Sequence, residues 1–242
     1  MNQKLKHILR DTAQLSPVPV TKNLRYDRET RKVLKKTLQP HSNCIDVGCH
    51  KGEILDMMLK YAPKGSHSGF EPIPYLYSFL SKKFYKKCKI YPIALSNKKG
   101  LSSFNYVITN PSYSGLKKRN YDRKGEKDKS IMIETDTLDN IIAEDFHVDL
   151  IKIDVEGAEM LVIEGSISTI KRCKPIIIFE FGKGASEVYQ STPETLYTMI
   201  TETLGLQLST MKRWLKNSPP VTFGKFKKEY DTSNNYYFIA YP

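Results

Sequence analysis

From residue 43 onward the chain alternates short apolar segments with amphipathic helical segments, and this alternation constrains the fold most. Strands that are separated by single helices build βαβ units, whose strands lie parallel in one sheet. The pattern therefore predicts an α/β, Rossmann-like domain. The expected strands are 43–48, 66–71, 89–94, 148–154, 175–181 and 236–241, and the expected helices are 53–61, 74–84, 158–170 and 193–204.

Two segments depart from this alternation. Residues 1–42 are basic, carry apolar side chains at helical spacing and end at Pro40, so we predict an N-terminal helical cap before a single domain at 43–242. Strands are also expected at 101–107 and 130–135. The polar, basic segment between them, around 108–130, is predicted to be an insertion or a mobile loop.

Several protein classes are excluded by simple counts. The longest apolar stretches fall far short of the roughly 18–20 residues that a membrane helix needs, and the first ten residues lack the apolar core of a signal peptide. We therefore expect a cytoplasmic protein with no transmembrane segment. The 4 cysteines form no C-x-x-C pair, which argues against a disulfide framework and against a zinc site.

The net charge of +12 arises from 38 Lys+Arg and 26 Asp+Glu, and it is unevenly distributed. Residues 82–99 contain lysines and no acid, and residues 117–129 form a second basic segment. Such segments attract phosphate, nucleic acid, anionic glycans or the anionic face of a membrane. They are equally compatible with ordinary solvated helix faces, which leaves the partner open.

The first candidate site is the loop that follows the strand at 43–48. Its sequence is Asp46-Val47-Gly48-Cys49-His50-Lys51-Gly52, and glycines at this position let a ligand approach the backbone closely. The spacing is not the G-x-G-x-x-G of dinucleotide-binding loops. An acid beside the loop favours a cation over a phosphate, such as the amino group of an amino-acid moiety. These residues point to S-adenosylmethionine rather than NAD, with His50 packed beside the cofactor.

A second acid, Glu71, ends the strand at 66–71 and precedes Pro72. A carboxylate at this place can accept hydrogen bonds from both hydroxyls of a ribose. The alternative is an acid that caps the following helix.

The third candidate site is Ile151-Lys152-Ile153-Asp154-Val155-Glu156-Gly157-Ala158-Glu159. Like charges so close need a cation or a shared proton. Asp154 and Glu156 can orient substrate hydroxyls, bind the methionine end of the cofactor, or offer oxygen ligands to Mg²⁺. Helix capping is the alternative, and it explains Glu159 more easily than Asp154.

Together these motifs resemble the FkbM family of S-adenosylmethionine-dependent methyltransferases over about residues 43–182. The resemblance rests on Ile45-Asp46-Val47-Gly48 with Gly52, Phe70-Glu71-Pro72, Ala94-Leu95-Ser96, Thr137-Leu138-Asp139 and, most specifically, residues 151–159. It implies the class I methyltransferase fold, a seven-stranded, mostly parallel sheet with helices on both faces. It also implies cofactor contacts at Asp46, Gly48, Glu71, Pro72, Ala94 and Ser96, with Ser96 near the adenine.

The family is associated mainly with O-methylation of sugars and other hydroxyl-bearing acceptors, so the resemblance implies a carbohydrate, glycan or related acceptor. Glu180 matches an acid common in such proteins after the fifth strand. A hydroxyl nucleophile needs a base, and we favour Asp154 as base or substrate orienter, with Glu156 and Glu180 as further catalytic candidates. The acids gather at one predicted sheet edge, whereas the lysine-rich segments are peripheral and could steer an anionic substrate.

Two other functions remain open. Asn110-Pro111-Ser112-Tyr113 resembles the Asn-Pro-Pro-Tyr element of nucleic-acid amino-methyltransferases, although that element would have to end the fourth strand, where residues 149–156 fit better. Nucleic acid is therefore the second choice. The other alternative is a non-catalytic module that binds the cofactor, because a fold alone does not establish activity.

Overall fold

The computed structural model describes residues 21–121 and 123–242, and its centre is a seven-stranded sheet. The strand order is β3-β2-β1-β7-β8-β10-β9. Neighbouring strands are parallel from β3 to β8, whereas β10 runs antiparallel to both β8 and β9. The strands are β1 (Cys44–Val47), β2 (His67–Phe70), β3 (Cys88–Tyr91), β7 (Leu150–Ile153), β8 (Ile176–Glu180), β9 (Gln207–Thr210) and β10 (Tyr237–Tyr241). The predicted mostly parallel α/β sheet is confirmed.

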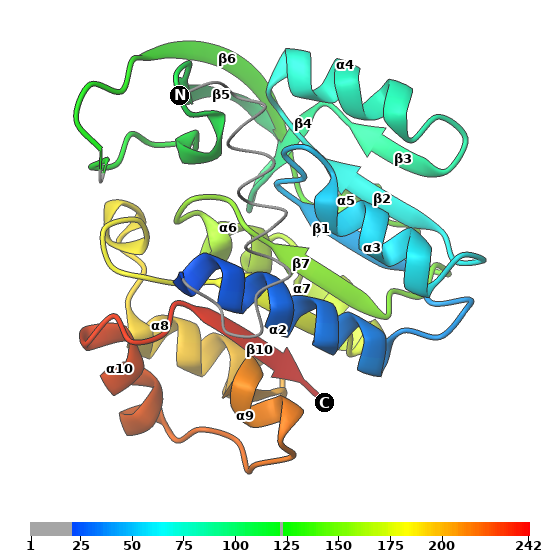
Figure 1. Ribbon diagram of the computed structural model, residues 1–242, viewed down its shortest axis with the longest axis vertical. Coiled ribbons are helices and arrows are strands. Elements are labelled where there is room, and N and C mark those ends of the chain that lie inside the picture. Colours follow the sequence, from blue (N-terminus) through cyan, green and yellow to red (C-terminus); the bar gives the residue numbers. More distant parts are fainter. Residues whose placement is uncertain (1–20, 122) are drawn as a thin grey trace.

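Helices cover both faces of this sheet because side chains along each strand alternate between the faces (Figure 1). Cys44, Leu150 and Ile178 pack on one face, and Ile45, Ile151 and Ile177 pack on the other. The first face carries α2 (Lys22–Thr37), α3 (Glu53–Tyr61), α4 (Pro74–Lys83) and α9 (Met211–Leu215). The second carries α5 (Leu138–Ile141), α6 (Glu159–Glu164), α7 (Ile167–Cys173), α8 (Pro193–Thr198) and α10 (Phe223–Asp231).

The N-terminal helix α2 lies within the predicted cap at 1–42, and residues 1–20 of that cap fall outside the described residues. Tyr26 and Val33 on α2 pack against Ile178 of β8 and Ile239 of β10. The helix therefore shares the core of the main sheet. No helix of the described chain is both long enough and apolar enough to cross a membrane.

Several elements differ from the sequence-based expectation. The helix expected at 158–170 is divided into α6 and α7 at Gly165, where a Cβ atom would lie 2.0 Å from the carbonyl oxygen of Ser96. The helix expected at 193–204 changes after α8 into a π-helical turn, Met199–Thr203. The sequence did not predict β9, α9 or α10, which are short elements whose apolar side chains find partners only in the tertiary core.

The predicted insertion around 108–130 connects two strands of a small second sheet with the order β4-β6-β5, and its last residues begin β6. Its strands are β4 (Ile93–Leu95), β5 (Gly100–Val107) and β6 (Asp128–Asp136), with a short 3₁₀ helix, Pro111–Tyr113, between the two long strands. Ile73 and Leu76 pack against Phe104 and Ile133, which fixes this sheet to the start of α4. The long β5–β6 hairpin rises above the main sheet in Figure 1, and its connecting segment folds back over the strand ends.

Candidate active site

A cavity of about 580 Å³ lies at the carboxyl ends of β1, β2, β7 and β8, where ligands bind in doubly wound sheets. Most of the predicted site residues line it: Asp46, Gly48, His50, Glu71, Pro72, Ala94, Asp154, Glu156 and Glu180. Gly52 and Ser96 are not among the lining residues. The parallel sheet therefore brings together acids that are far apart in the sequence.

The loop after β1 needs glycine at position 48 for two reasons. Gly48 has a φ of 82°, and a Cβ atom there would lie 2.0 Å from the backbone oxygen of Asp154. Gly52 has a different role, since a Cβ atom on it would lie 2.4 Å from the ring of Phe84. Gly48 thus permits close packing of the β1 and β7 loops at the cavity, whereas Gly52 permits the packing of α3 on Phe84.

Glu71 is tied to the loop of the first strand and to the start of α4. Its side chain is buried, and its two oxygens accept hydrogen bonds from the backbone N–H groups of His50 at 2.8 Å and Ile73 at 3.0 Å. Burial raises the pKa of Glu71 to about 7, against the lowering effect of these two donors. Because each carboxylate oxygen has further lone pairs, Glu71 can still accept ligand hydroxyls. Ser96 does not line the cavity, and its backbone N–H donates a hydrogen bond to the backbone oxygen of Asp136 at 2.9 Å.

Asp46 is almost fully buried, and its Oδ2 atom has no hydrogen-bond partner among the described residues. Burial raises the pKa of Asp46 to about 7, although nearby Lys152 lowers it. An unsatisfied buried carboxylate oxygen is costly, and a cationic or N–H-bearing ligand in the cavity would satisfy it. The orphaned oxygen fits the cationic end that the sequence predicted for the ligand.

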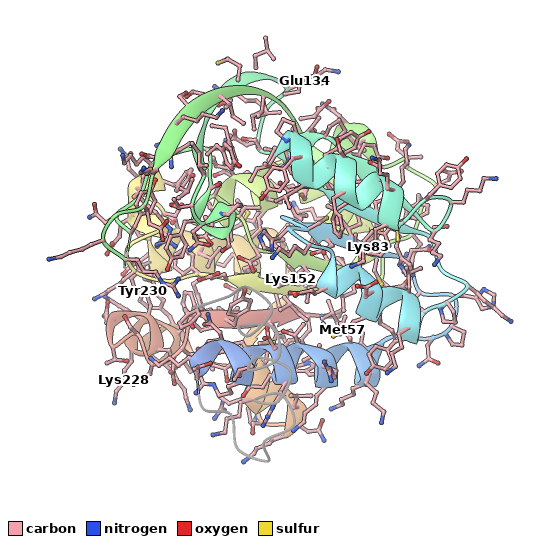
Figure 2. The ribbon with its side chains drawn as sticks, turned by 45° about the horizontal axis from the view of Figure 1, so that its top comes forward. Met57, Lys83, Glu134, Lys152, Lys228 and Tyr230 are labelled. Carbon is pink, nitrogen blue, oxygen red and sulfur yellow. The ribbon has the colours of Figure 1, made fainter. Side chains whose placement is uncertain are left out.

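Asp154 is held by two side chains to which the sequence analysis assigned no role. Its Oδ2 atom accepts a hydrogen bond from Lys152 Nζ at 2.8 Å and another from the Tyr237 hydroxyl at 2.5 Å. Burial raises the pKa of Asp154, but Lys152 and these hydrogen bonds outweigh it and lower the pKa to about 2. Asp154 is therefore ionised at neutral pH. Figure 2 shows Lys152 near the centre of the molecule, and this side chain lines the cavity.

Lys152 stood inside the predicted motif, but an apolar strand gives no local signal that one of its side chains is a buried cation. Its side chain is only 5% exposed, and Asp46 lies opposite it in the β1–β7 register. Burial lowers the pKa of Lys152, but Asp154, Asp46 and Glu180 raise it further than burial lowers it. Tyr237 comes from the last strand, so only the fold brings it to Asp154.

The insertion supplies a second cation to the cavity. Arg119 Nη2 lies 2.7 Å from Glu156 Oε2, with side-chain exposures of 11% and 17%, and the guanidinium carbon stands 4.6 Å from the ring centroid of Tyr113. The peripheral placement expected for all of the basic segment 117–129 is therefore wrong for Arg119. Lys117, beside it, donates its backbone N–H to the Tyr189 hydroxyl at 2.8 Å.

The remaining acids divide into two roles. Glu159 accepts the backbone N–H groups of Val155 and Gly157, so it stabilises the β7–α6 loop as the capping alternative expected. Glu180 lines the cavity, and burial together with Asp154 raises its pKa well above the usual range. The raised pKa of Glu180 and the lowered pKa of Asp154 fit one proton shared between these two closely spaced carboxyl groups.

The predicted Mg²⁺ site at Asp154 and Glu156 is not supported. Within residues 21–121 and 123–242, no group of three His, Cys, Asp or Glu side chains is arranged to hold a metal ion. The two acids are instead bonded to Lys152 and Arg119, respectively. These cations satisfy the carboxylates, and their positive charge disfavours a divalent ion beside them.

The stability of the ligand-free protein should fall as the pH rises from 5 to 8. Burial raises the pKa of Asp46, Glu71 and Glu159 to about 7, and that of Glu156 to about 8. The folded state therefore binds more protons than the unfolded state in this range, so the free energy of unfolding declines with increasing pH. Urea unfolding at intervals of half a pH unit checks this. Constant stability between pH 5 and 8 would show that these acids are ionised throughout.

The sheet order with an antiparallel β10, and the cavity at the strand ends, is the fold of the class I S-adenosylmethionine-dependent methyltransferases. The model of the methyltransferase FkbM domain matches residues 46–207, so the chain belongs to this family. The predicted family is thereby confirmed. No curated protein matches the sequence.

Solved structures agree with this fold. The methyltransferase FkbM from Methylobacillus flagellatus KT has a TM-score of 0.52 and 15% identity, and the match covers 87% of this chain and 48% of that chain. This chain thus spans about half the length of that protein. A StiE O-MT fragment (TM-score 0.45, 13% identity, 98% of this chain and 79% of that chain) and a SAM-dependent methyltransferase from Aquifex aeolicus (0.43, 16%, 88% and 87%) are less similar and add nothing to the assignment.

Proposed function

We propose that this chain transfers a methyl group from S-adenosylmethionine to a hydroxyl of a carbohydrate, glycan or related small acceptor. The observation that carries the proposal is the position of ionised Asp154 in the same cavity as Asp46 and Glu71. The three acids serve different tasks there. Asp46 and Glu71 suit the cofactor, and Asp154 suits the hydroxyl of the acceptor.

The residues at β1 and β2 fit the cofactor. Asp46 Oδ2, which is buried without a hydrogen-bond partner among the described residues, would accept the amino group. Glu71, held in place by two backbone donors, would accept the ribose hydroxyls. Gly48 keeps the loop free of a side chain. When bound, the cofactor supplies a methyl group on a sulfonium, which is a good leaving group, so the protein mainly provides alignment.

Asp154 would orient the acceptor hydroxyl and take its proton. Lys152 and Tyr237 both bond to Oδ2, and Glu180 hydrogen-bonds the same carboxyl group, so three side chains fix the orientation of Asp154. A hydroxyl oxygen that gains a bond to carbon becomes strongly acidic. A carboxylate with a pKa of about 2 can therefore accept that proton late in the transfer.

The cavity lining also suits a polar, ring-shaped acceptor. It includes aromatic side chains and polar or cationic ones: Asn23, Tyr113, Arg119, Lys183, Tyr230 and Tyr236. Aromatic faces stack on the apolar faces of sugar rings, while amide and cationic groups donate hydrogen bonds to hydroxyls and acid groups. This composition favours a carbohydrate, including an anionic one.

Methylation of a nucleobase is less well supported. Asn110 lies in the β5–β6 connection and accepts a hydrogen bond from the Ser112 hydroxyl at 2.8 Å. Asp154, not Asn110, follows the central strand β7. An amine-specific site needs its acceptor groups at that strand end.

Calorimetric titration with S-adenosylhomocysteine tests cofactor binding. We expect micromolar affinity in the native protein and a loss of at least about 10- to 100-fold in Glu71→Ala, because even one hydrogen bond to a carboxylate is worth about 1.5–3 kcal/mol. Glu144→Ala, an exposed acid on the surface, is the matched control. Glu71→Gln serves as the folding control, because its remaining side-chain oxygen can still accept a hydrogen bond from one of the two backbone N–H groups that hold Glu71. Native-like affinity in Glu71→Ala would contradict the assignment.

Transfer of a labelled methyl group to a panel of glycans and nucleic acids tests the acceptor. Label in a glycan hydroxyl supports the proposal. Label in RNA or DNA that is lost in Asn110→Ala and kept in Asp154→Ala would favour the nucleic-acid alternative. Cofactor binding without turnover on any acceptor would favour a binding module.

A further inference from the structure

A second cavity, of about 600 Å³, lies between α2, α9 and α10, and its lining is strongly basic. The acids that line it are Glu29 and Glu229, and they face a larger set of cations: Arg25, Lys212, Arg213, Lys216 and Lys225. None of these cations belongs to the lysine-rich segments 82–99 and 117–129. The three helices assemble this charge, and the sequence gives no contiguous sign of it.

Two arginines at this cavity each carry a nitrogen donor that has no acceptor among the described residues. Arg213 is anchored through Nη2 to the carbonyl of Pro219 at 2.9 Å, and Arg25 through Nη2 to the Tyr26 hydroxyl at 2.7 Å. The Nε atoms of both are buried and have no hydrogen-bond partner among the described residues. Glu29 forms an ion pair with Arg25, but its Oε1 atom lies 4.0 Å from Arg25 Nε, which is beyond hydrogen-bond reach. Buried donors of this kind are costly unless a ligand or water accepts from them.

The arrangement suits a multiply charged oxyanion. A guanidinium that is anchored at one terminal nitrogen still offers Nε for phosphate or carboxylate oxygens. Lys212, Lys216 and Lys225 are exposed around the arginines, and compact lysine charges suit phosphate. The five cations outnumber the two acids of the lining, and a ligand with a single carboxylate would not neutralise the remaining positive charge.

The second cavity adjoins the active-site cavity. Asn235 lines both, and it accepts a hydrogen bond from the Tyr26 hydroxyl at 3.3 Å. Tyr26 lines the active-site cavity, and its ring centroid lies 4.9 Å from that of Tyr237, which bonds to Asp154. A ligand that reaches around Asn235 could therefore occupy both cavities.

We infer that the second cavity binds a phosphate or diphosphate group, carried either by the acceptor itself or by a separate small phosphate anion. Binding at this cavity does not depend on methyltransferase activity. It can therefore be tested even if the acceptor proposed above is wrong.

Calorimetric titration of the full chain with inorganic pyrophosphate, at about physiological salt, tests the site. We expect a dissociation constant below about 1 mM that weakens as salt is added. Absence of binding up to about 10 mM would overturn the inference.

Three variants separate a built site from general charge attraction. Arg213→Lys keeps the charge but removes Nε, and we expect pyrophosphate affinity to fall about tenfold. Lys225→Gln should weaken binding, whereas Lys228→Gln, on the same helix but outside the cavity lining, should not. Equal affinities in Arg213→Lys, Lys225→Gln and Lys228→Gln would show non-specific attraction and overturn the site. Unchanged S-adenosylhomocysteine affinity confirms that each variant is folded.

Methyl transfer distinguishes the two sources of phosphate. If the acceptor carries it, pyrophosphate inhibits transfer competitively with the acceptor, and the Arg213→Lys variant raises KM for phosphorylated acceptors only. If a separate anion binds, pyrophosphate changes the rate without competing. Either result supports the site.

Discussion

Replacement of Asp154 by Asn is expected to lower the rate of methyl transfer by about 10²- to 10⁴-fold, the usual contribution of a positioned base. The amide cannot take the acceptor's proton, and it meets Lys152 Nζ, 2.8 Å away in the native chain, without a negative charge. The affinity for S-adenosylhomocysteine should change far less. Initial rates with labelled methyl donor and titration of the same preparation measure both quantities.

The control for this variant is Glu144→Gln, an exposed acid for which we expect native rate and affinity. Equal losses of rate and affinity in Asp154→Asn would instead place Asp154 on the cofactor, as the sequence also allowed. A native rate would remove Asp154 from the reaction.

Replacement of Lys152 by Met should destabilise the protein by about 3–5 kcal/mol, the cost of breaking a buried ion pair from one side. Asp154, Asp46 and Glu180 would then face each other without this cation. Removal of Lys152 also raises the pKa of Asp154 in the folded state, because Lys152 lowers that pKa in the native protein. The folded variant therefore binds a proton at Asp154 more readily than the folded native protein does. The loss of stability should therefore be larger at pH 8 than at pH 5. Urea unfolding at both pH values measures it.

Lys171→Met, which removes an exposed lysine from α7, is the matched control and should stay within about 0.5 kcal/mol of the native protein. The double variant Lys152→Met with Asp154→Asn should recover part of the lost stability, because it removes both partners. A loss that is independent of pH and not relieved in the double variant would assign Lys152 to packing alone.

The sequence was sufficient to predict the parallel sheet and the acids that gather at one of its edges. The alternation of strands and helices implied a parallel sheet, and the carboxyl ends of parallel strands meet at one edge. Asp46, Glu71 and Asp154 could therefore be placed together from their positions after three strands, and the structure brings them to one cavity. The role of Gly48 could also be predicted from the sequence, because a close turn after a strand needs glycine.

Other features depended on how separate elements pack. Tyr237 reaches Asp154 only because β10 inserts antiparallel between β8 and β9. Arg119 reaches Glu156 only because the β5–β6 connection folds back over the strand ends. Gly52 and Ser96 show the converse, since both lie in matching motifs but outside the cavity lining. A motif places a backbone segment near a site, whereas the packing of its neighbours decides which side chains face it.

The sequence by itself thus determined the fold class, the family and the acids at the sheet edge, because these follow from local periodicity and from short contiguous motifs. The tertiary structure alone decided which cations meet those acids and that α2, α9 and α10 gather a second set of cations around another cavity. The physical reason is that charge pairing acts over a few ångströms in space. Residues far apart in the chain come within that range only after the helices have packed on the sheet.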